Sequence, residues 1–447
     1  MSVQFTRLRI WVLICACFFT FGSYFAFDQP STISKELKAF TGINDEQYAY
    51  LYSAYSIANS ISTIFGGFFI DKVGVRACSF LFSGLVNVGV LLFAIGVTIK
   101  IYGIMVLGRA IYGMGGGLIT VVQQAIVAFY FKGSKHLGMS FSIILTASRL
   151  GSVLNFWISA PLTNATSVPF SVFFASILCI LSLISVTLVY FMDVNYEKTS
   201  GSAATTPSKK IVFNDVLNFP LRLWILYISV ALYYVSVFCF IAISTDYIQD
   251  KWTNISDVHA SWISGAVYDV SLILSIPLGI LVDTIGRRIS LAIIGTCIAI
   301  PAHCLFAFTD VYPLVGMILL GISYSMICAT VWSCASLIVR LKEVGTAISL
   351  MTAVQMLTSS IFNAIVGSVK EKTGSYATDE IIFVVVTIVT LASFIFLKFL
   401  DSKSHGEMDA RNEGKSKEEE EIEDDAALLE NEDEASEILG EDVELTI

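Results

Sequence analysis

An arginine in the middle of a long apolar run offers the clearest chemistry in this sequence. Arg149 lies about twelve residues into the run 137–160, so in a helix it would be ~18 Å deep, close to the midplane of a ~30 Å hydrocarbon layer. A guanidinium keeps its proton and must face water or an anion. We therefore expect Arg149 to bind the carboxylate of a substrate. The alternative is an internal ion pair that only holds helices together.

Two more side chains in apolar runs could contact the same substrate. Asp269 is the only acidic residue well inside a predicted membrane span, and charge at such depth is costly enough to mark a functional candidate. It could bind an amine or a proton, pair with Arg149, or only line a cavity. Trp332 has small and polar residues on its helix face, so it could clamp a substrate or make a cation–π contact. Interior packing is the alternative for Trp332.

Weaker candidates are polar residues that recur at helical spacing in other apolar runs. Those expected to line a cavity are Tyr55, Asn59, Gln124 and Gln355. Arg109 begins a stripe with Gly113 in the run 102–130, where a glycine-rich segment favours close helix packing. We expect Arg109 and Gly113 to act in packing or gating rather than as direct ligands.

Other kinds of chemistry find no support in the sequence. The four histidines are scattered, and the nine cysteines lie in apolar runs without metal-ligand spacing, so we expect no metal, no cofactor and no disulfide framework. A phosphate-cradling loop is also missing, which argues against ATP-driven transport. We find neither an enzyme signature nor a nucleic-acid-binding pattern. The net charge of −10 comes mostly from the residues after position 400.

The elements that must hold the candidate residues are membrane helices. Hydrophobic residues make up 55% of the chain and charged residues only 14%, too few to cover a soluble surface. A membrane-spanning helix needs ~20 apolar residues. The qualifying runs are 9–27, 48–70, 77–98, 102–130, 137–160, 170–192, 221–244, 260–282, 289–309, 312–338, 344–368 and 379–399. The chain is therefore predicted to be an all-α membrane protein with twelve spans, surrounded by membrane lipid.

A polar linker divides the twelve runs six and six. The predicted domains are an N-terminal six-helix bundle at 1–192, a cytosolic linker at 193–220, a C-terminal six-helix bundle at 221–400 and a disordered acidic tail at 401–447. Basic residues favour one side of the membrane by sixteen to six, which predicts that both termini are cytosolic. The glycosylation sequons at Asn164 and Asn254 fall on the opposite side in this topology.

A short loop pattern occurs once in each half, offset by 212 residues. Its repeated residues are Gly67, Asp71 and Arg76 in the first half and Gly279, Asp283, Arg287 and Arg288 in the second. The pattern resembles the signature loop of the major facilitator superfamily, G-x-x-x-D-[RK]-x-G-[RK]-[RK]. An aspartate at a helix end can pair with basic groups and with the N-terminus of a neighbouring helix. We expect these residues to form a latch that holds one conformation of two rocking bundles.

Several longer segments, taken together, point to one family within that superfamily. They are FGSYF at 21–25 with FDQP at 27–30, YSAYS at 52–56, GGFFID at 66–71, GR at 108–109 with GMGG at 113–116, FKG at 131–133, SRLGS at 148–152 with Asn155, and GISYS at 321–325 before Trp332. On these residues the chain resembles major facilitator superfamily domain-containing protein 1, a lysosomal dipeptide uniporter. The resemblance extends from the first predicted span to the eleventh.

The resemblance implies a peptide-binding pocket. Arg149 matches the arginine of the family that binds the peptide carboxylate, and Trp332 matches its pocket tryptophan. At the position of a family glutamate that can hold the peptide amine, this chain has Gly117, so the amine site is open to question. Asp269 could replace that glutamate from across the cavity. The family also associates with a glycosylated single-span membrane protein, so an accessory subunit is a possible partner.

The acidic tail contains a possible sorting signal. Asp424, Leu428 and Leu429 fit the acidic dileucine pattern, which together with the resemblance predicts a lysosomal membrane; the plasma membrane is the alternative. We predict an alternating-access carrier for facilitated export of dipeptides or similar carboxylate-bearing solutes to the cytosol. One rival is a carrier of organic acids or amino acids. Another is a receptor or scaffold on the same fold that transports nothing.

Overall fold

The structure is a computed structural model, and it describes residues 3–131, 137–200, 219–339, 343–404, 406 and 408–409. These residues form helices joined by short loops. The N-terminal half comprises α1 (Val3–Thr32), α2 (Ser34–Thr41), α3 (Asp45–Val73), α4 (Val75–Ile99), α5 (Tyr102–Phe131), α6 (Leu137–Ala165) and α7 (Val168–Ser200). The C-terminal half comprises α9 (Leu221–Tyr234), η1 (Val235–Cys239), α10 (Phe240–Lys251), α11 (Asp257–Ile285), α12 (Arg288–Phe308), α13 (Pro313–Ile338), α14 (Val344–Thr373) and α15 (Ala377–Ser402).

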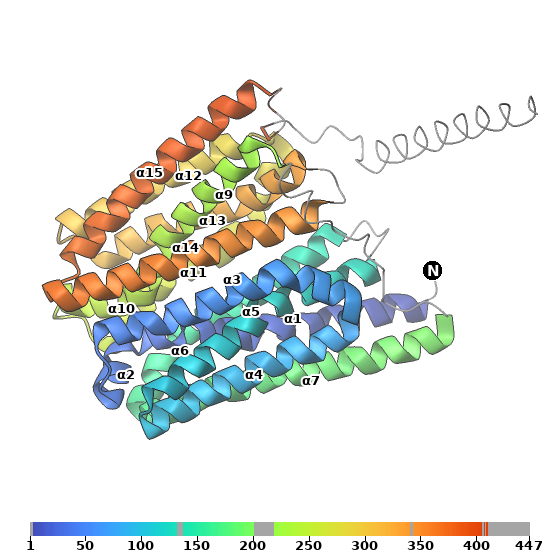
Figure 1. Cartoon of the computed structure of the whole chain (residues 1–447), viewed down its shortest axis with the longest axis horizontal. Helices are drawn as coiled ribbons and strands as arrows, with labels where there is room; N and C mark the ends of the chain where they lie inside the picture. The colour runs from blue at the N-terminus through green and yellow to red at the C-terminus, as the bar shows by residue number, and fades with distance from the viewer. Residues whose placement is uncertain are drawn as a thin grey trace, which may run out of the picture.

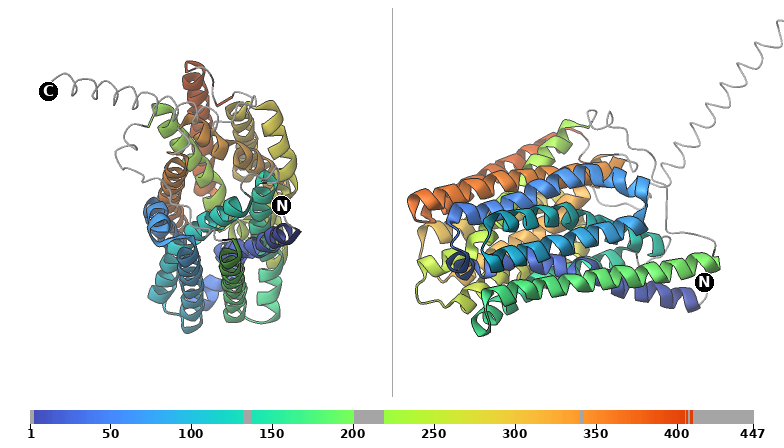
Figure 2. Two further views of the ribbon diagram at one scale, coloured as in Figure 1. Left: turned by 90° about the vertical axis from the view of Figure 1, so that its right-hand side faces the viewer. Right: turned by 60° about the horizontal axis from the view of Figure 1, so that its bottom comes forward.

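The two halves are bundles of nearly parallel long helices that lie against each other (Figure 1). Figure 2 shows the same division from two further directions. Each half has its own large apolar core. We call one end of the molecule the α2 end, because the short helix α2 covers it, and the opposite end the terminal end, because α1 starts and α15 finishes there (Figure 1).

Twelve long helical segments cross the molecule in the described residues, counting α9, η1 and α10 as one. Eleven of them are long and apolar enough to span a membrane. The remaining one, α3, is 29 residues long but has a polar stripe. That stripe faces the other half: Ser53 Oγ donates to Ser360 O and Ser60 Oγ donates to Ala353 O on α14, both at 2.8 Å. The predicted all-helical membrane architecture is confirmed.

The first span is longer than predicted. We placed its end at residue 27, but α1 continues to Thr32, with Pro30 inside the helix. The segment Leu8–Thr32 is still apolar enough to span a membrane. The prediction that Asp269 is the only acidic residue well inside a span is therefore wrong, because Asp28 also lies in a membrane helix.

Two helix pairs join the halves along their length, α3 with α14 and α6 with α11. Polar contacts between the halves run from the α2 end to about the middle of these pairs. In the part of the chain that the structure describes, those nearest the terminal end are Ser60 with Ala353 and Arg149 with Ser275. The described contacts thus close the α2 end and the middle of the molecule.

Candidate functional site

Arg149 lies where the two halves meet. It belongs to α6, and its Nη1 donates a hydrogen bond to Ser275 Oγ on α11 of the other half. Its guanidinium carbon is 5.7 Å from the ring centre of Tyr324 on α13. The ion pairs among the described residues involve other cations, so no described carboxylate pairs with Arg149. A part-buried guanidinium without an acidic partner is suited to bind an anion.

An aromatic cluster, Tyr234, Phe238, Tyr324 and Trp332, surrounds one side of Arg149. The ring centres of Tyr234 and Tyr324 are 6.2 Å apart, as are those of Tyr234 and Trp332. Trp332 Nε1 donates to the Tyr234 hydroxyl at 3.2 Å. The structure therefore brings the two residues that the resemblance singled out, Arg149 and Trp332, to one cluster. Rigid aromatic faces can pack against the body of a bound solute.

A change of helix type places Tyr234 in this cluster. Helix α9 ends at Tyr234, and the five residues of η1 form a π-helical segment before α10 continues the same span. Such segments shift the direction of the residues beside them and are frequent at functional sites. We did not predict this segment, since the run 221–244 reads as uniformly apolar.

Asp269 lies apart from Arg149. Trp157 Nε1 donates to its carboxylate oxygens at 3.3 and 3.4 Å. Trp157 is 46% exposed and stacks on Trp262, so this acid sits at an outer edge of the α6–α11 pair. Ser275, the partner of Arg149, is six residues away on α11, and at about 100° per residue the two side chains point in different directions. Asp269 is not the structural partner of Arg149.

Asp28 is a buried acidic residue that sequence reasoning missed, as it did Asp246 on α10 and Glu380 on α15. Asp28 is 2% exposed, and Tyr268 on α11 donates its hydroxyl to Asp28 Oδ1 at 3.1 Å. Its second carboxylate oxygen, Oδ2, is buried without a hydrogen-bond partner among the described residues. Extending the predicted span beyond residue 27 would have included it, because the segment Leu8–Thr32 is apolar enough to span a membrane even with two charged residues, Arg9 and Asp28.

Arg109 is held in a cage of aromatic rings within the N-terminal half. Its guanidinium carbon lies 4.8 to 5.8 Å from five ring centres, those of Phe27, Tyr52, Tyr55, Phe93 and Tyr112. It also donates to the carbonyl of Leu51 at 3.3 Å. Gly113, one turn further on α5, lies so close to α3 that a Cβ there would be 2.2 Å from Tyr55 O. These positions favour a packing role for both residues.

Asn59 fills the space beside Gly117. A Cβ at position 117 would lie 2.3 Å from Asn59 Oδ1, which also accepts a hydrogen bond from Thr63 at 2.9 Å. The glutamate of the resembling family could therefore occupy this position only if Asn59 moved. Asn59 Nδ2 lies 3.4 Å from the hydroxyl of Tyr55, so this pair lines the α3 side of the interior.

The last two predicted cavity residues differ in burial. Gln124 is part-buried on the same face of α5 as Gly117, seven residues away. Gln355 on α14 is 3% exposed, and its Oε1 has no hydrogen-bond partner among the described residues. A buried polar atom without a partner costs about 1–3 kcal/mol. Such atoms are expected where a solute or water binds.

The predicted latch can be described only in part. The side chains of Gly67, Asp71 and Asp283 lie outside the described residues. Gly74 and Gly286, which occupy equivalent places in the two halves, have φ of +92° and +68° and end α3 and α11. Only glycine adopts such conformations readily. The positive φ at both positions therefore explains why the loop has a glycine there in each half.

The basic residues of the repeated loops contact their own halves. Arg76 Nε donates to Asp193 on α7, which also accepts from Tyr130 at 2.7 Å. Arg288 is buried at the start of α12, where the main-chain N–H of Arg287 donates to Asp409 O at 3.0 Å.

Gly279 in the second loop and Asp409 in the tail are also described by the structure. Gly279 has open space where a Cβ would be. Asp409 also accepts from Ile289 N at 2.8 Å, so the first part of the predicted tail packs on the C-terminal half. The sorting residues Asp424, Leu428 and Leu429 lie outside the described residues.

Both sequons lie at the α2 end. Asn164 is exposed near the end of α6, and Asn254 is exposed in the turn between α10 and α11. This end is opposite the one where α1 starts (Figure 1). The two asparagines are therefore exposed at the same end of the molecule.

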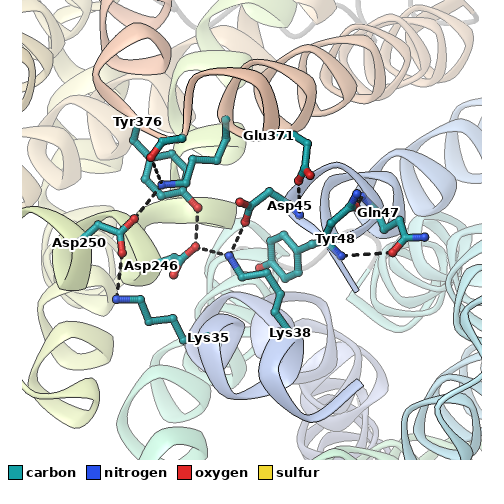
Figure 3. Close-up of polar contacts among 12 residues, drawn as sticks. Lys35, Lys38, Asp45, Gln47, Tyr48, Asp246, Asp250, Glu371 and Tyr376 are labelled. Atoms are coloured by element: carbon teal, nitrogen blue, oxygen red, sulfur yellow. Dashed lines mark hydrogen bonds and ion pairs between the residues drawn. The ribbon is translucent and has the colours of Figure 1, made fainter. Parts of the chain in front are cut away.

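Charged residues also close the α2 end, and Figure 3 shows their contacts. We call this set the α2-end cluster: Lys35, Lys38, Asp45, Asp246, Asp250, Lys370 and Tyr376. Lys38 Nζ lies 2.5 Å from both Asp45 in its own half and Asp246 in the other half. Lys35 Nζ lies 2.9 Å from Asp250, which also pairs with Lys370 at 2.7 Å. The cluster links α2 and α3 to α10, α14 and α15.

Burial changes the protonation of α2. The pKa of Glu36 is raised to about 7, chiefly by desolvation and also by the nearby charge of Asp257. Burial by itself would lower the pKa of Lys38, but its ion pairs with Asp246 and Asp45 raise it overall. Lys38 is therefore a permanent cation in the closed α2 end, whereas Glu36 changes charge near neutral pH.

Two bundles of membrane-length helices that meet at an arginine and an aromatic cluster have the architecture of a membrane transporter. Comparisons with known proteins agree. The model of the Major Facilitator Superfamily matches residues 10–363 and 226–430. The fold is similar to the crystal structures of the nucleoside transporter NupG, with a TM-score of 0.71 and 14% identity over 87% of this chain and 99% of that one. It is equally similar to the peptide transporter POT, with a TM-score of 0.69 and 14% identity over 92% and 100%.

Closer relatives specify the family. The chain is 32% identical to the lysosomal dipeptide transporter MFSD1 of Homo sapiens, over 90% of this chain and 88% of that one. It is 30% identical to the protein of the same name from Danio rerio, over 89% and 88%. The chain belongs to the Major Facilitator Superfamily and, within it, to the family of the MFSD1 transporters.

Proposed function

We propose that this protein carries dipeptides out of the lysosome by alternating access. The observation that carries the proposal is Arg149, which lies between the halves beside the aromatic cluster and, among the described residues, has no carboxylate partner. A planar guanidinium binds a carboxylate through two parallel, charge-assisted hydrogen bonds. Its relatives in Homo sapiens and Danio rerio are named lysosomal dipeptide transporters, which supports both the proposed substrate and the proposed membrane.

We further propose that both termini are cytosolic and that the α2 end faces the lumen. The excess of basic residues at the terminal end and the two exposed sequons at the α2 end support this orientation. The α2-end cluster then acts as a lumenal gate, closed in this conformation. Rocking of the halves would break the cluster and expose the interior to the lumen.

We also propose that transport is facilitated diffusion, since the first span lacks the E-x-x-E-R pattern of proton-coupled peptide carriers and Asp28 is the single acidic residue in Leu8–Thr32. The test uses the purified protein in liposomes and a labelled dipeptide. Uptake should follow the dipeptide gradient without a pH difference. Uptake that requires an inward proton gradient would contradict uniport.

The key variant is Arg149→Lys, which keeps the positive charge but loses the planar fork. Losing one partner of a buried charged pair costs about 2–5 kcal/mol, or roughly 30- to 5000-fold in affinity. Ligand-induced thermal stabilisation by the dipeptide should therefore disappear, because only bound ligand stabilises. Full retention of binding in Arg149→Lys would refute the carboxylate site.

A second candidate function is transport of organic acids or amino acids. Gly117 favours it, because the glutamate that could hold a peptide amine is missing and Asn59 fills the space. Thermal-shift screening of dipeptides against monocarboxylates and amino acids distinguishes the two. A protein stabilised by none of them, and without uptake activity, would be the receptor or scaffold that we considered from the sequence.

A further inference from the structure

A buried carboxylate and the predicted carboxylate-binding arginine contact the same face of one helix. Asp28 accepts from the Tyr268 hydroxyl, and Arg149 donates to Ser275 Oγ. Tyr268 and Ser275 both belong to α11 and are seven residues apart, so they share a face and are separated by about 10 Å along the helix axis. Helix α11 thus sets the spacing between a negative group on α1 and a positive group on α6.

That spacing matches an extended dipeptide. Its amine and carboxylate are about 6 Å apart, since consecutive Cα atoms are ~3.8 Å apart and one further bond of ~1.5 Å lies at each end. Two charge-assisted hydrogen bonds of ~2.8 Å bring the distance between the binding groups to about 11 Å. A free amino acid spans about 3–4 Å less and a tripeptide about 3–4 Å more, so a dipeptide is the nearest of the three to the two-turn separation of Tyr268 and Ser275.

Unpartnered polar atoms lie around the same space. Ser152 and Asn155 are on α6 and Ser271 is on α11, and all three are at most 1% exposed. Asn155 Nδ2 and Ser271 Oγ have no hydrogen-bond partner among the described residues. Ser152 Oγ and Asp28 Oδ2 have none of ordinary geometry, although the Ser152 hydroxyl is near enough to interact with the Asp28 carboxylate. Ser271 lies between Tyr268 and Ser275 in sequence. Native proteins rarely leave such atoms unpaired, so their grouping indicates a place where a polar ligand completes the hydrogen bonding.

We infer that Asp28 binds the ammonium group of the substrate, and that Asp28 and Arg149 are the two ends of one site for a zwitterion of dipeptide length. This inference rests on the proposed function and adds the amine site that Gly117 leaves undetermined. In this conformation Asp28 is closed off from the α2 end by two contacts between the halves. Ser31 Oγ donates to Ile241 O at 2.5 Å, and Tyr48 OH donates to Ala242 O at 2.8 Å. Opening of the lumenal gate separates these contacts and admits the substrate.

Asp269 could instead bind the ammonium group, or Asp28 could have a purely structural role. Asp269 points away from Ser275 and is bound to the exposed Trp157, so it does not face Arg149. Asp28 could instead only balance the charge of Arg109, which lies in the same half. Arg109 is near enough for its charge to act on the Asp28 carboxylate, but it is surrounded by aromatic rings and carbonyl oxygens, and no described carboxylate is within ion-pair distance of it. Charge balance also would not explain the unpaired atoms on α6 and α11.

The experiment compares binding of Ala-Ala and N-acetyl-Ala-Ala to the purified full-length protein by thermal shift and calorimetry. N-acetylation removes the ammonium and keeps the carboxylate. Wild type should prefer Ala-Ala by roughly 30-fold or more, the loss expected when one partner of a buried charged pair is removed. Asp28→Asn should weaken Ala-Ala by a similar factor and leave N-acetyl-Ala-Ala within about threefold, so the preference disappears.

Tyr268→Phe keeps the ring and removes only the hydroxyl that positions Asp28. It should weaken Ala-Ala by roughly 3- to 10-fold, the value of one hydrogen bond, and leave the acetylated peptide unchanged. If Asp28→Asn does not fold, this variant carries the test.

Each other outcome contradicts a stated claim. A variant that keeps the full preference for Ala-Ala, or that weakens both peptides equally, refutes the amine site and leaves the charge-balance role. A wild type that binds both peptides equally well also refutes the amine site and leaves the carboxylate site intact. A wild type that binds neither peptide refutes the proposed function and this inference with it.

Discussion

The lumenal gate leads to a quantitative comparison between two lysines on one helix. Lys38 and Lys35 are three residues apart on α2, and each pairs with an aspartate of the other half. Their environments differ. The Lys38 and Asp246 side chains are 16% and 4% exposed, whereas Lys35 and Asp250 are both 39% exposed. The same substitution to glutamine at each position therefore tests how much burial strengthens a pair that holds the halves together.

Lys38→Gln leaves a buried Asp246 without its cation. Breaking a fully buried pair costs about 3–5 kcal/mol, and the partial exposure of Lys38 lowers this to about 2–3 kcal/mol. Closure at the α2 end should weaken by roughly 30- to 150-fold. Lys35→Gln is the matched control. An exposed pair contributes about 0–1 kcal/mol, so its effect should stay below roughly fivefold and should fade at high salt.

Hydrogen–deuterium exchange of α2 and α10 in the purified protein measures this difference. Amides that exchange only when the α2 end opens should exchange faster by the factor stated for each variant, while the first turns of α12, which lie at the terminal end, serve as the internal reference. Equal effects of Lys38→Gln and Lys35→Gln would show that burial does not decide the strength of these pairs. An unchanged exchange rate in Lys38→Gln would show that the α2-end cluster does not hold the α2 end closed.

Three further predictions follow from the same structure. The pKa of Glu36, raised by burial to about 7 from its ordinary 4.5, means that the closed α2 end holds an extra proton; closure should be strongest at pH 4.5 and below and lost as pH rises through 7. The protection of α2 amides, taken relative to their intrinsic exchange rate at each pH, should accordingly be higher at pH 5 than at pH 8 in wild type, and Glu36→Gln should remove this difference in protection. Gly117→Glu should lower the melting temperature because of its clash with Asn59, and a second change, Asn59→Ala, should restore it; no restoration would place the clash elsewhere. Asn164→Gln and Asn254→Gln should each increase electrophoretic mobility when expressed in a glycosylating host, and mobility that endoglycosidase leaves unchanged in wild type would contradict the proposed orientation.

Local sequence patterns were sufficient for the architecture. Runs of ~20 apolar residues predict membrane helices because the hydrocarbon layer leaves the backbone no other partner for its hydrogen bonds. A repeated loop in each half predicts two related bundles. Arg149 stood out for the same reason, since a charge that cannot be neutralised is rare in a span and needs a defined environment.

The helix ends and side-chain directions needed the folded chain. Asp28 was missed because a charged residue followed by Pro30 looks like the end of a span, whereas packing in the bundle lets α1 continue to Thr32. The sequence correctly placed Asp269 in a membrane helix, but its position along that helix does not tell which way its side chain points. The structure turns it toward Trp157 at the outer edge of α6 and α11.

The sequence by itself determined the membrane class, the twelve spans and the arginine in their midst, because each depends on residues that are neighbours along the chain. Only the tertiary structure decided which groups face each other between the halves. Lys38 and Asp246 are 208 residues apart in sequence, and Asp28 meets Tyr268 across 240. Such pairs depend on how two separately folded bundles dock, and the periodicity of a single helix holds no information about that docking.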